Sequence, residues 1–288
     1  MNSFGEDSPQ RLRLGSALRR LRLRADLTGE QLAQQAGMSQ SKVSRIELGQ
    51  SAAAVADVER WAQATGASDD ERAELLELAE AAVTETIAWR TVGDRGLGGL
   101  QRDVQVMEIS AATIRYFHPV LVPGLLQTAE YYRRLGKATF PEGRPDLAAA
   151  MAARMERQAM LYDETKRLEF VTTEVALRWR FGPPPTMLAQ LDRILTVATL
   201  TSVEIGIIPQ TAELAPSYMH GFTIFDDRGD EDPIVEVETL TTRLTITDPR
   251  DVETYRQHFA RLREAAVSGD DALALLRAIM ADLRSSST

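Results

Sequence analysis

The chain has 288 residues, of which 44% are hydrophobic and none is cysteine. This length allows two domains with their own cores, and the lack of cysteine excludes disulfides, thiolate nucleophiles and cysteine-ligated metals. No apolar run approaches the roughly 18 residues that a membrane span needs, and the N-terminal residues lack the basic and then apolar order of a signal peptide. We therefore expect a cytoplasmic protein with no membrane partner.

The net charge of −9 is unevenly distributed along the chain. Residues 10–50 contain eight Arg or Lys and three Asp or Glu, a local charge of +5, which leaves −14 for the remaining residues. A basic segment in an otherwise acidic chain favours contact with a polyanion at that segment and discourages it elsewhere.

Five helices are expected in residues 10–90, which we predict to form the first domain. The first runs from about Gln10 to Ala25, the fourth from about 55 to 65 and the fifth from 69 to about 89. Between them, Thr28 and Ser39 are N-cap residues for two short helices, and Gly37 permits the turn that joins these helices. The sequence thus predicts a helix, a tight turn and a second helix.

The second short helix has one apolar face and one face of hydrogen-bonding side chains. Val43 and Ile46 point inward at an i, i+3 interval. An α-helix fits the major groove, where Gln can pair with adenine, Arg with guanine and Ser with several bases. The residues predicted to contact bases are Gln40, Ser41, Ser44 and Arg45.

Residues 11–64 resemble the Xre-type, phage-repressor-like helix-turn-helix domain. The resemblance is carried by Leu32-Ala33, Gly37, Ser39 and the run Ile46-Glu47-Leu48-Gly49. It implies that the second short helix reads DNA bases and that Arg22 pairs with Glu47 as a structural ion pair. It also implies that four residues lie near the DNA backbone: Thr28, Gln31, Ser39 and Lys42.

A glycine-rich stretch at residues 93–99 predicts a linker to a second domain over residues 100–284. This second domain is expected to be α+β, with a helix near 104–116, further helices near 128, 145–162, 175–180 and 186–200, and two C-terminal helices at 249–266 and 270–283. A small sheet is predicted from strands near residues 168–172, 203–208, 221–225, 234–240 and 244–247.

The second domain also resembles a known family. The segments VLVPGLLQ (120–127), LEFVTTEVALR (168–178), VEIGIIP (203–209) and IVEVET (234–239) look like the uncharacterised domain that follows the helix-turn-helix in a large actinobacterial regulator family. The resemblance implies a transcriptional regulator of development or secondary metabolism. It further implies a small acidic partner protein, encoded nearby, that docks on this domain.

Catalytic and metal-binding motifs are not recognisable in the sequence. The three histidines have no metal-ligand spacing, and no nucleophile elbow, phosphate-binding loop or dinucleotide fingerprint occurs. The acidic stretch at residues 226–232 has the composition of a solvated hairpin loop. We expect no catalytic residue, no metal and no cofactor.

The sequence therefore predicts a homodimeric regulator that binds double-stranded DNA and docks a partner protein, with the apolar segment 120–127 as one candidate surface. The leading alternative is a ligand-sensing repressor with a pocket near Trp179, Phe181, Tyr218, Met219 and Phe222. An enzyme or a toxin-antitoxin component is a further alternative with less support.

Overall fold

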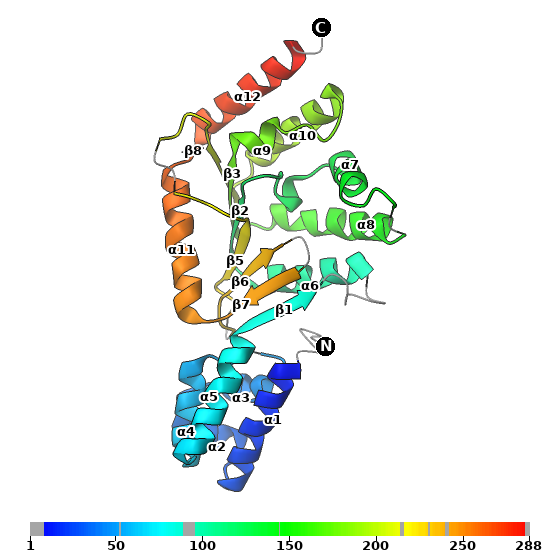
Figure 1. Ribbon diagram of the computed structural model, residues 1–288. Coiled ribbons are helices and arrows are strands. Elements are labelled where there is room, and N and C mark those ends of the chain that lie inside the picture. The colour runs from blue at the N-terminus through cyan, green and yellow to red at the C-terminus, as the bar shows by residue number, and fades with distance from the viewer. Residues whose placement is uncertain are drawn as a thin grey trace.

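The computed structural model describes residues 9–51, 53–88, 96–143, 145–213, 216–229, 231–239 and 242–285. Figure 1 shows an N-terminal bundle of helices at one end of a larger domain, which is built on a single mixed sheet with helices on both faces. The predicted fold, an all-α N-terminal domain followed by an α+β domain with C-terminal helices, is confirmed.

The N-terminal domain packs around its first helix. Trp61 is fully buried, and its indole Nε1 donates a hydrogen bond to the Leu18 carbonyl at 3.2 Å. Leu14, Leu18 and Leu21 line the inner side of the first helix, whereas Leu12 is 42% exposed. The helices are α1 (Pro9–Arg24), α2 (Gly29–Ala36), α3 (Gln40–Glu47), α4 (Val55–Thr65) and α5 (Asp69–Val83).

The sheet has eight strands in the order β1-β7-β6-β5-β2-β3-β4-β8. The three strands β2, β3 and β4 are parallel to one another, and the remaining neighbours are antiparallel. The strands are β1 (Thr84–Ala88), β2 (Thr113–His118), β3 (Arg167–Thr173), β4 (Val203–Ile208), β5 (Phe222–Asp226), β6 (Ile234–Glu238), β7 (Thr242–Ile246) and β8 (Val267–Ser268).

Helices cover both faces of the sheet. Helix α11 lies along one face, and the helices between β2 and β4 lie against the other (Figure 1). The helices are α6 (Gly96–Ser110), α7 (Ala129–Thr139), α8 (Leu147–Arg157), α9 (Glu174–Arg178), α10 (Pro184–Val197), α11 (Pro249–Glu264) and α12 (Gly269–Ser285), with 3-10 turns η3 (Gly124–Leu126) and η4 (Gln158–Tyr162).

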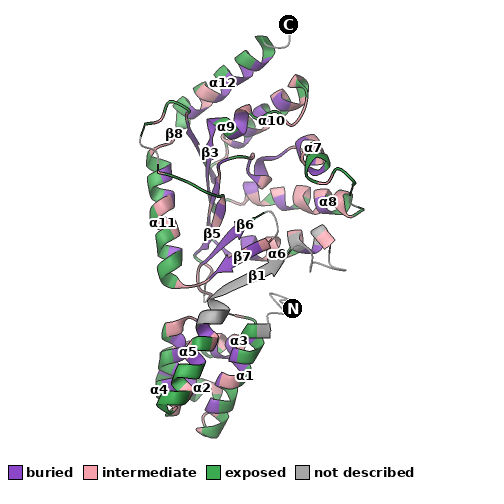
Figure 2. Ribbon diagram, viewed as in Figure 1, coloured by how far each residue is buried: buried purple, intermediate pink, exposed green. Residues whose placement is uncertain are grey.

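Side chains of the central strands alternate between two cores, because successive residues of a strand point to opposite faces. Ile114 and Tyr116 of β2 pack on the side of α7 and α10, whereas Phe117 packs on the side of α11 with Phe259 and Leu262. Figure 2 shows the resulting pattern, with a buried sheet and an exposed outer side of α11.

Two predicted helices end earlier in the structure, and each is followed by a strand. The fifth helix ends at Val83, and residues 84–88 form β1 against β7 instead of continuing to residue 89. The helix predicted near 104–116 ends at Ser110, and residues 113–118 form β2 between β5 and β3. Both strands depend on partners more than 50 residues away, which local periodicity cannot reveal.

The predicted linker at 93–99 is also partly helical. Residues 96–99 form the first turn of α6, while residues 93–95 lie outside the described part of the chain. The boundary between the domains therefore lies close to the end of α5, from which the chain enters the sheet directly.

Candidate nucleic-acid interface

Helix α2 begins with a capping box. Thr28 Oγ1 accepts a hydrogen bond from the Gln31 backbone N–H at 3.2 Å, and Gln31 Oε1 accepts one from the Thr28 N–H at 2.9 Å. At the other end, Gly37 adopts a left-handed conformation with φ of 64°, which a residue with a Cβ rarely adopts. These local features fix the two ends of α2 and the direction in which the chain leaves it.

Helix α3 presents the predicted reading face. Ser39 Oγ caps it by accepting from the Lys42 N–H at 3.2 Å, while Val43 and Ile46 are each 1% exposed and face the domain core. The structure places the four predicted base-contacting residues on the remaining surface of this helix. Gln40 is exposed, and Ser41, Ser44 and Arg45 are partly exposed.

Close packing against α1 fixes the position of α3. Arg22 Nε donates to Glu47 Oε1 at 2.5 Å, Arg22 Nη2 donates to Glu47 Oε2 at 2.8 Å, and Arg22 Nη1 also reaches the Leu27 carbonyl at 2.8 Å. At Gly15 the backbones nearly touch, because an added Cβ would lie 2.3 Å from the Ile46 carbonyl oxygen. The end of α3 is therefore held by an ion pair and by a backbone approach that requires glycine.

Three of the four residues predicted to lie near the DNA backbone already serve as helix caps or cap partners. Thr28 and Gln31 form the capping box of α2, and Ser39 caps α3 while its hydroxyl lies 3.1 Å from that of Ser41. All three residues are exposed. Capping places them at helix N-termini, where backbone N–H groups and the helix dipole favour an anion.

Lys42, the fourth predicted backbone contact, is held inside the molecule. Its Nζ lies 2.9 Å from Asp57 Oδ2 on α4 and 2.7 Å from Asp232 Oδ2 in the loop between β5 and β6. Burial by itself would lower the pKa of Lys42, but hydrogen bonds to Asp232 and Asp57 outweigh it and raise the pKa. The side chain is only 15% exposed.

Sequence reasoning missed Asp57 and Asp232. Asp57 is 2% exposed and also bonds Arg60, which in turn donates to the Ala36 carbonyl at 2.9 Å at the end of α2. Asp232 belongs to the stretch that the sequence assigned to a solvated hairpin. Its neighbour Lys42 is 190 positions away, so no local pattern signals the contact.

The candidate docking segment 120–127 mainly belongs to the core. Val122, Leu125 and Leu126 are each 1% exposed, and buried Gln127 donates to the Val122 carbonyl at 2.7 Å. Val120 is the one large hydrophobic residue of this segment that is exposed. The prediction that this segment forms an apolar groove or surface patch is therefore wrong, because the segment fills space between the sheet and the helices.

The aromatic residues suggested to surround a ligand pocket do not come together. Trp179 and Phe181 stack with ring centroids 5.3 Å apart, and Phe181 packs against the core on the α7 and α10 side. Phe222 belongs to the core under α11, and Met219 is 97% exposed. Phe181 and Phe222 lie on opposite faces of the sheet, so the five residues cannot line one cavity.

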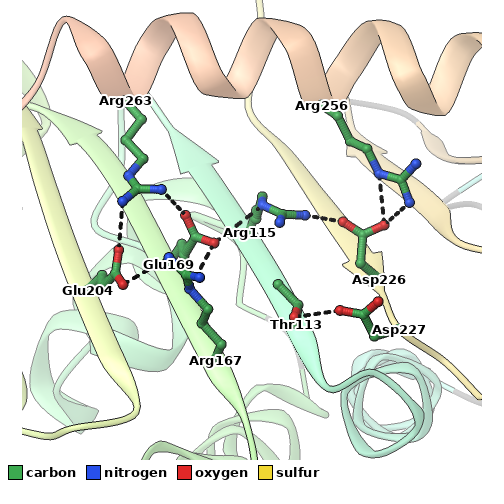
Figure 3. A network of polar contacts seen from close by, with 9 residues as sticks. All are labelled: Thr113, Arg115, Arg167, Glu169, Glu204, Asp226, Asp227, Arg256 and Arg263. Carbon is green, nitrogen blue, oxygen red and sulfur yellow. Dashed lines mark hydrogen bonds and ion pairs between the residues drawn. The ribbon is translucent and has the colours of Figure 1, made fainter.

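A network of charged residues lies between the sheet and α11. Figure 3 shows Arg256 and Arg263 reaching from α11 to carboxylates on the strands below. Arg263 Nη1 lies 3.1 Å from Glu169 Oε2, and Arg115 Nε lies 3.4 Å from Glu169 Oε1. Since each carboxylate in this network has an arginine or hydroxyl partner, the network holds α11 on the sheet.

The described residues contain neither a metal-binding cluster nor a membrane-spanning helix. No group of three or more His, Asp or Glu side chains there is arranged to hold a metal ion. None of the helices described has the length and hydrophobicity needed to cross a bilayer.

Comparison with protein families agrees with this two-part architecture. Residues 13–75 match the model of a helix-turn-helix domain, and residues 101–278 match the model described as a domain of unknown function (DUF5753). The second match spans more than half of the chain. The chain belongs to the DUF5753 family. In this DUF5753 protein, the helix-turn-helix match covers most of α1, all of α2 to α4 and the start of α5.

No significant match was found among curated proteins. Among solved structures, one similar chain is from "Structure of TrmBL2, an archaeal chromatin protein, shows a novel mode of DNA binding", with 15% identity, a TM-score of 0.33 and coverage of 73% of this chain. This chain covers 66% of that protein, just under two thirds of its length. At this TM-score the likeness carries no argument about fold or function.

Proposed function

We propose that this DUF5753 protein is a transcriptional regulator that binds double-stranded DNA sequence-specifically through α3, in the manner of Xre-type repressors. The observation that carries the proposal is the geometry of α2 and α3. Both helices are capped at their N-termini, Gly37 makes the turn, and α3 turns Gln40 and Arg45 away from a core formed by Val43 and Ile46. A helix with such a face can read base edges in the major groove.

Local charge supports the same assignment. Residues 10–50 carry +5 in a chain of net charge −9, so the helices that would approach DNA form its basic part. Phosphate contacts supply much of the affinity of such complexes and make it dependent on salt. We expect binding to weaken steeply as the salt concentration rises.

We further propose that the protein binds a palindromic operator as a homodimer, in the cytoplasm and associated with the nucleoid. Two recognition helices would then lie about 34 Å apart, one turn of DNA. The resemblance of the C-terminal domain to actinobacterial regulators supports a role in development or secondary metabolism, and a small acidic partner protein that docks on this domain. Trp179, 49% exposed, and Met219 are apolar side chains available to such a partner. We propose no catalytic role.

The protein should select its operator from a pool of random duplexes. At the selected sequence, Arg45→Ala should cost roughly 1 to 3 kcal/mol of binding free energy and relax the preference at one base pair. Arg20→Ala removes the same charge at an exposed position on α1 and is the matched control. This variant should weaken binding to all sequences alike. Absence of any enriched sequence, or equal effects of the two variants on specificity, would contradict the proposal.

A further inference from the structure

One ionic contact joins the two domains at the candidate reading helix. Lys42 of α3 meets two carboxylates, one from each domain: Asp57 at 2.9 Å and Asp232 at 2.7 Å. Asp57 is also paired with Arg60, so this one carboxylate cannot balance both cations. Asp232 of the C-terminal domain supplies the second carboxylate, which makes the charge balance of Lys42 depend on both domains.

In the β5–β6 loop, the described residues 227–229 and 231–233 are held by specific contacts and do not form a solvated acidic turn. At its start, Asp226 pairs with Arg115 and Arg256, and Asp227 Oδ2 accepts from Thr113 Oγ1 at 2.7 Å (Figure 3). Asp227 also has φ of 53°, an uncommon conformation outside glycine that these contacts hold in place.

Arg228 closes the loop and fixes Asp232. Its Nη1 donates to the Asp232 carbonyl at 2.9 Å, its Nε donates to Ser110 Oγ at 3.1 Å at the end of α6, and it pairs with Glu231. The carboxylates of Asp226, Asp227 and Glu231 thus have their partners within the C-terminal domain. The Asp232 carboxylate, by contrast, is directed across the domain boundary to Lys42.

The loop lies beside more of α3 than Lys42. Burial is the largest influence that lowers the pKa of Arg228, and the positive charge of nearby Arg45 acts in the same direction. Ser44 and Arg45 are only partly exposed, whereas Gln40 at the start of α3 is exposed. Lys42, through its contact with Asp232, and Arg45, through its closeness to Arg228, therefore place α3 beside the β5–β6 loop.

We propose that the β5–β6 loop is an autoinhibitory element in which the Asp232 carboxylate occupies the position of a DNA phosphate at Lys42. The inference rests on the proposed function, and it adds how binding is regulated. A carboxylate and a phosphate compete for the same ammonium, so α3 can enter the major groove only when the loop has moved away. When only a fraction of molecules is open, the apparent dissociation constant is the intrinsic one divided by that fraction.

The first test compares two variants of the full chain that change the net charge equally. Asp232→Asn keeps the size of the side chain and removes its charge. Asp271→Asn does the same at an exposed position on α12. On the operator selected by the wild type, Asp232→Asn should bind about threefold to thirtyfold more tightly. The reason is that a partly exposed ion pair stabilises the closed state relative to the open state by about that factor. Asp271→Asn should bind like the wild type.

The second test detects the contact in the unmodified protein. A carbodiimide joins a lysine amine to a carboxylate only when the two are in contact, and the chain has only three lysines. Mass spectrometry should find Lys42 linked to Asp232, and prior addition of operator DNA should suppress this link. A Lys42–Asp232 link that persists unchanged on the DNA complex would overturn the inference, as would its absence from the free protein; a link between Lys42 and Asp57 within the helical domain is expected in both states.

The two proposals fail in different ways. If the wild type selects an operator and Asp232→Asn binds it no better than Asp271→Asn, autoinhibition is wrong and the proposed function stands. If neither the wild type nor Asp232→Asn selects any sequence, the proposed function is wrong and the inference falls with it, even if Lys42 and Asp232 crosslink.

Discussion

Arg22 of α1 and Glu47 of α3 face each other with two hydrogen bonds, at 2.5 and 2.8 Å, and both side chains are about a tenth exposed. The pair joins the first helix to the last turn of the candidate reading helix. Arg22 also bonds the Leu27 carbonyl, so it connects the loop between α1 and α2 to the same point.

Glu47→Ala should therefore destabilise the protein. Removing one partner leaves a largely buried guanidinium without its counter-charge, which costs about 2 to 4 kcal/mol. Denaturation by urea measures the loss, and Arg22→Met with Glu47→Leu should recover part of it because no charge is left unpaired. The base preference of the protein that remains folded should not change; a changed preference would mean that Glu47 acts in recognition.

Gly15→Ala should also destabilise the N-terminal domain. The new Cβ would lie 2.3 Å from the Ile46 carbonyl oxygen and 2.9 Å from that of Glu47, and backbone atoms cannot move aside as a flexible side chain can. We expect a loss of about 1 to 3 kcal/mol despite the better helix propensity of alanine. The matched control is Ser16→Ala at the next, exposed position. If Gly15→Ala melted at or above the temperature of Ser16→Ala, the close contact of α1 with α3 would be disproved.

Glu71 should make the stability of the helical domain depend on pH. Its hydrogen bond with Arg24, followed by those with Ser68, lowers the pKa of Glu71 to about 2. A lowered pKa means that the stabilisation is present above the ordinary value of 4.5 and is lost as the pH falls toward 2. Glu71→Gln should therefore be less stable than the wild type at pH 7, and the difference should shrink below pH 4.5. Calorimetry across this range is the measurement, and Glu74→Gln, which removes the same charge at an exposed position on the same helix, is the control.

Lys166 should stabilise the end of α6. Its Nζ donates to the carbonyls of Glu108 at 2.8 Å, Ile109 at 3.0 Å and Ala111 at 2.7 Å. Carbonyl groups at the C-terminal end of a helix lack the backbone N–H donors that a further turn would provide. Lys166→Met should cost about 1 to 3 kcal/mol, since the acceptors lose a charged donor. Lys137→Met, at an exposed position on α7, is the control; equal stability of the two variants would show that water replaces the Lys166 ammonium.

Local signals in the sequence were sufficient for most of the helices. The capping hydroxyl of Thr28, the turn at Gly37 and the cap at Ser39 act within a few residues, so they predict α2 and α3 directly. The strands β3 to β7 were also predicted, because β-branched and aromatic residues gather in each of them. By contrast, helical periodicity extends into β1 and β2, whose identity as strands depends on pairing with β7, β5 and β3.

The sequence by itself determined the two-domain organisation, the capped helix-turn-helix and the polar face of α3, because helix caps, turns and side-chain periodicity act over short distances. Tertiary structure alone decided what surrounds that face. The sequence predicts a surface patch at residues 120–127, whereas the fold buries most of this segment. The sequence likewise predicts a solvated loop around Asp232, whereas the fold places Asp232 beside Lys42. Burial and long-range ion pairs depend on how segments far apart in the chain pack, and no local pattern records that.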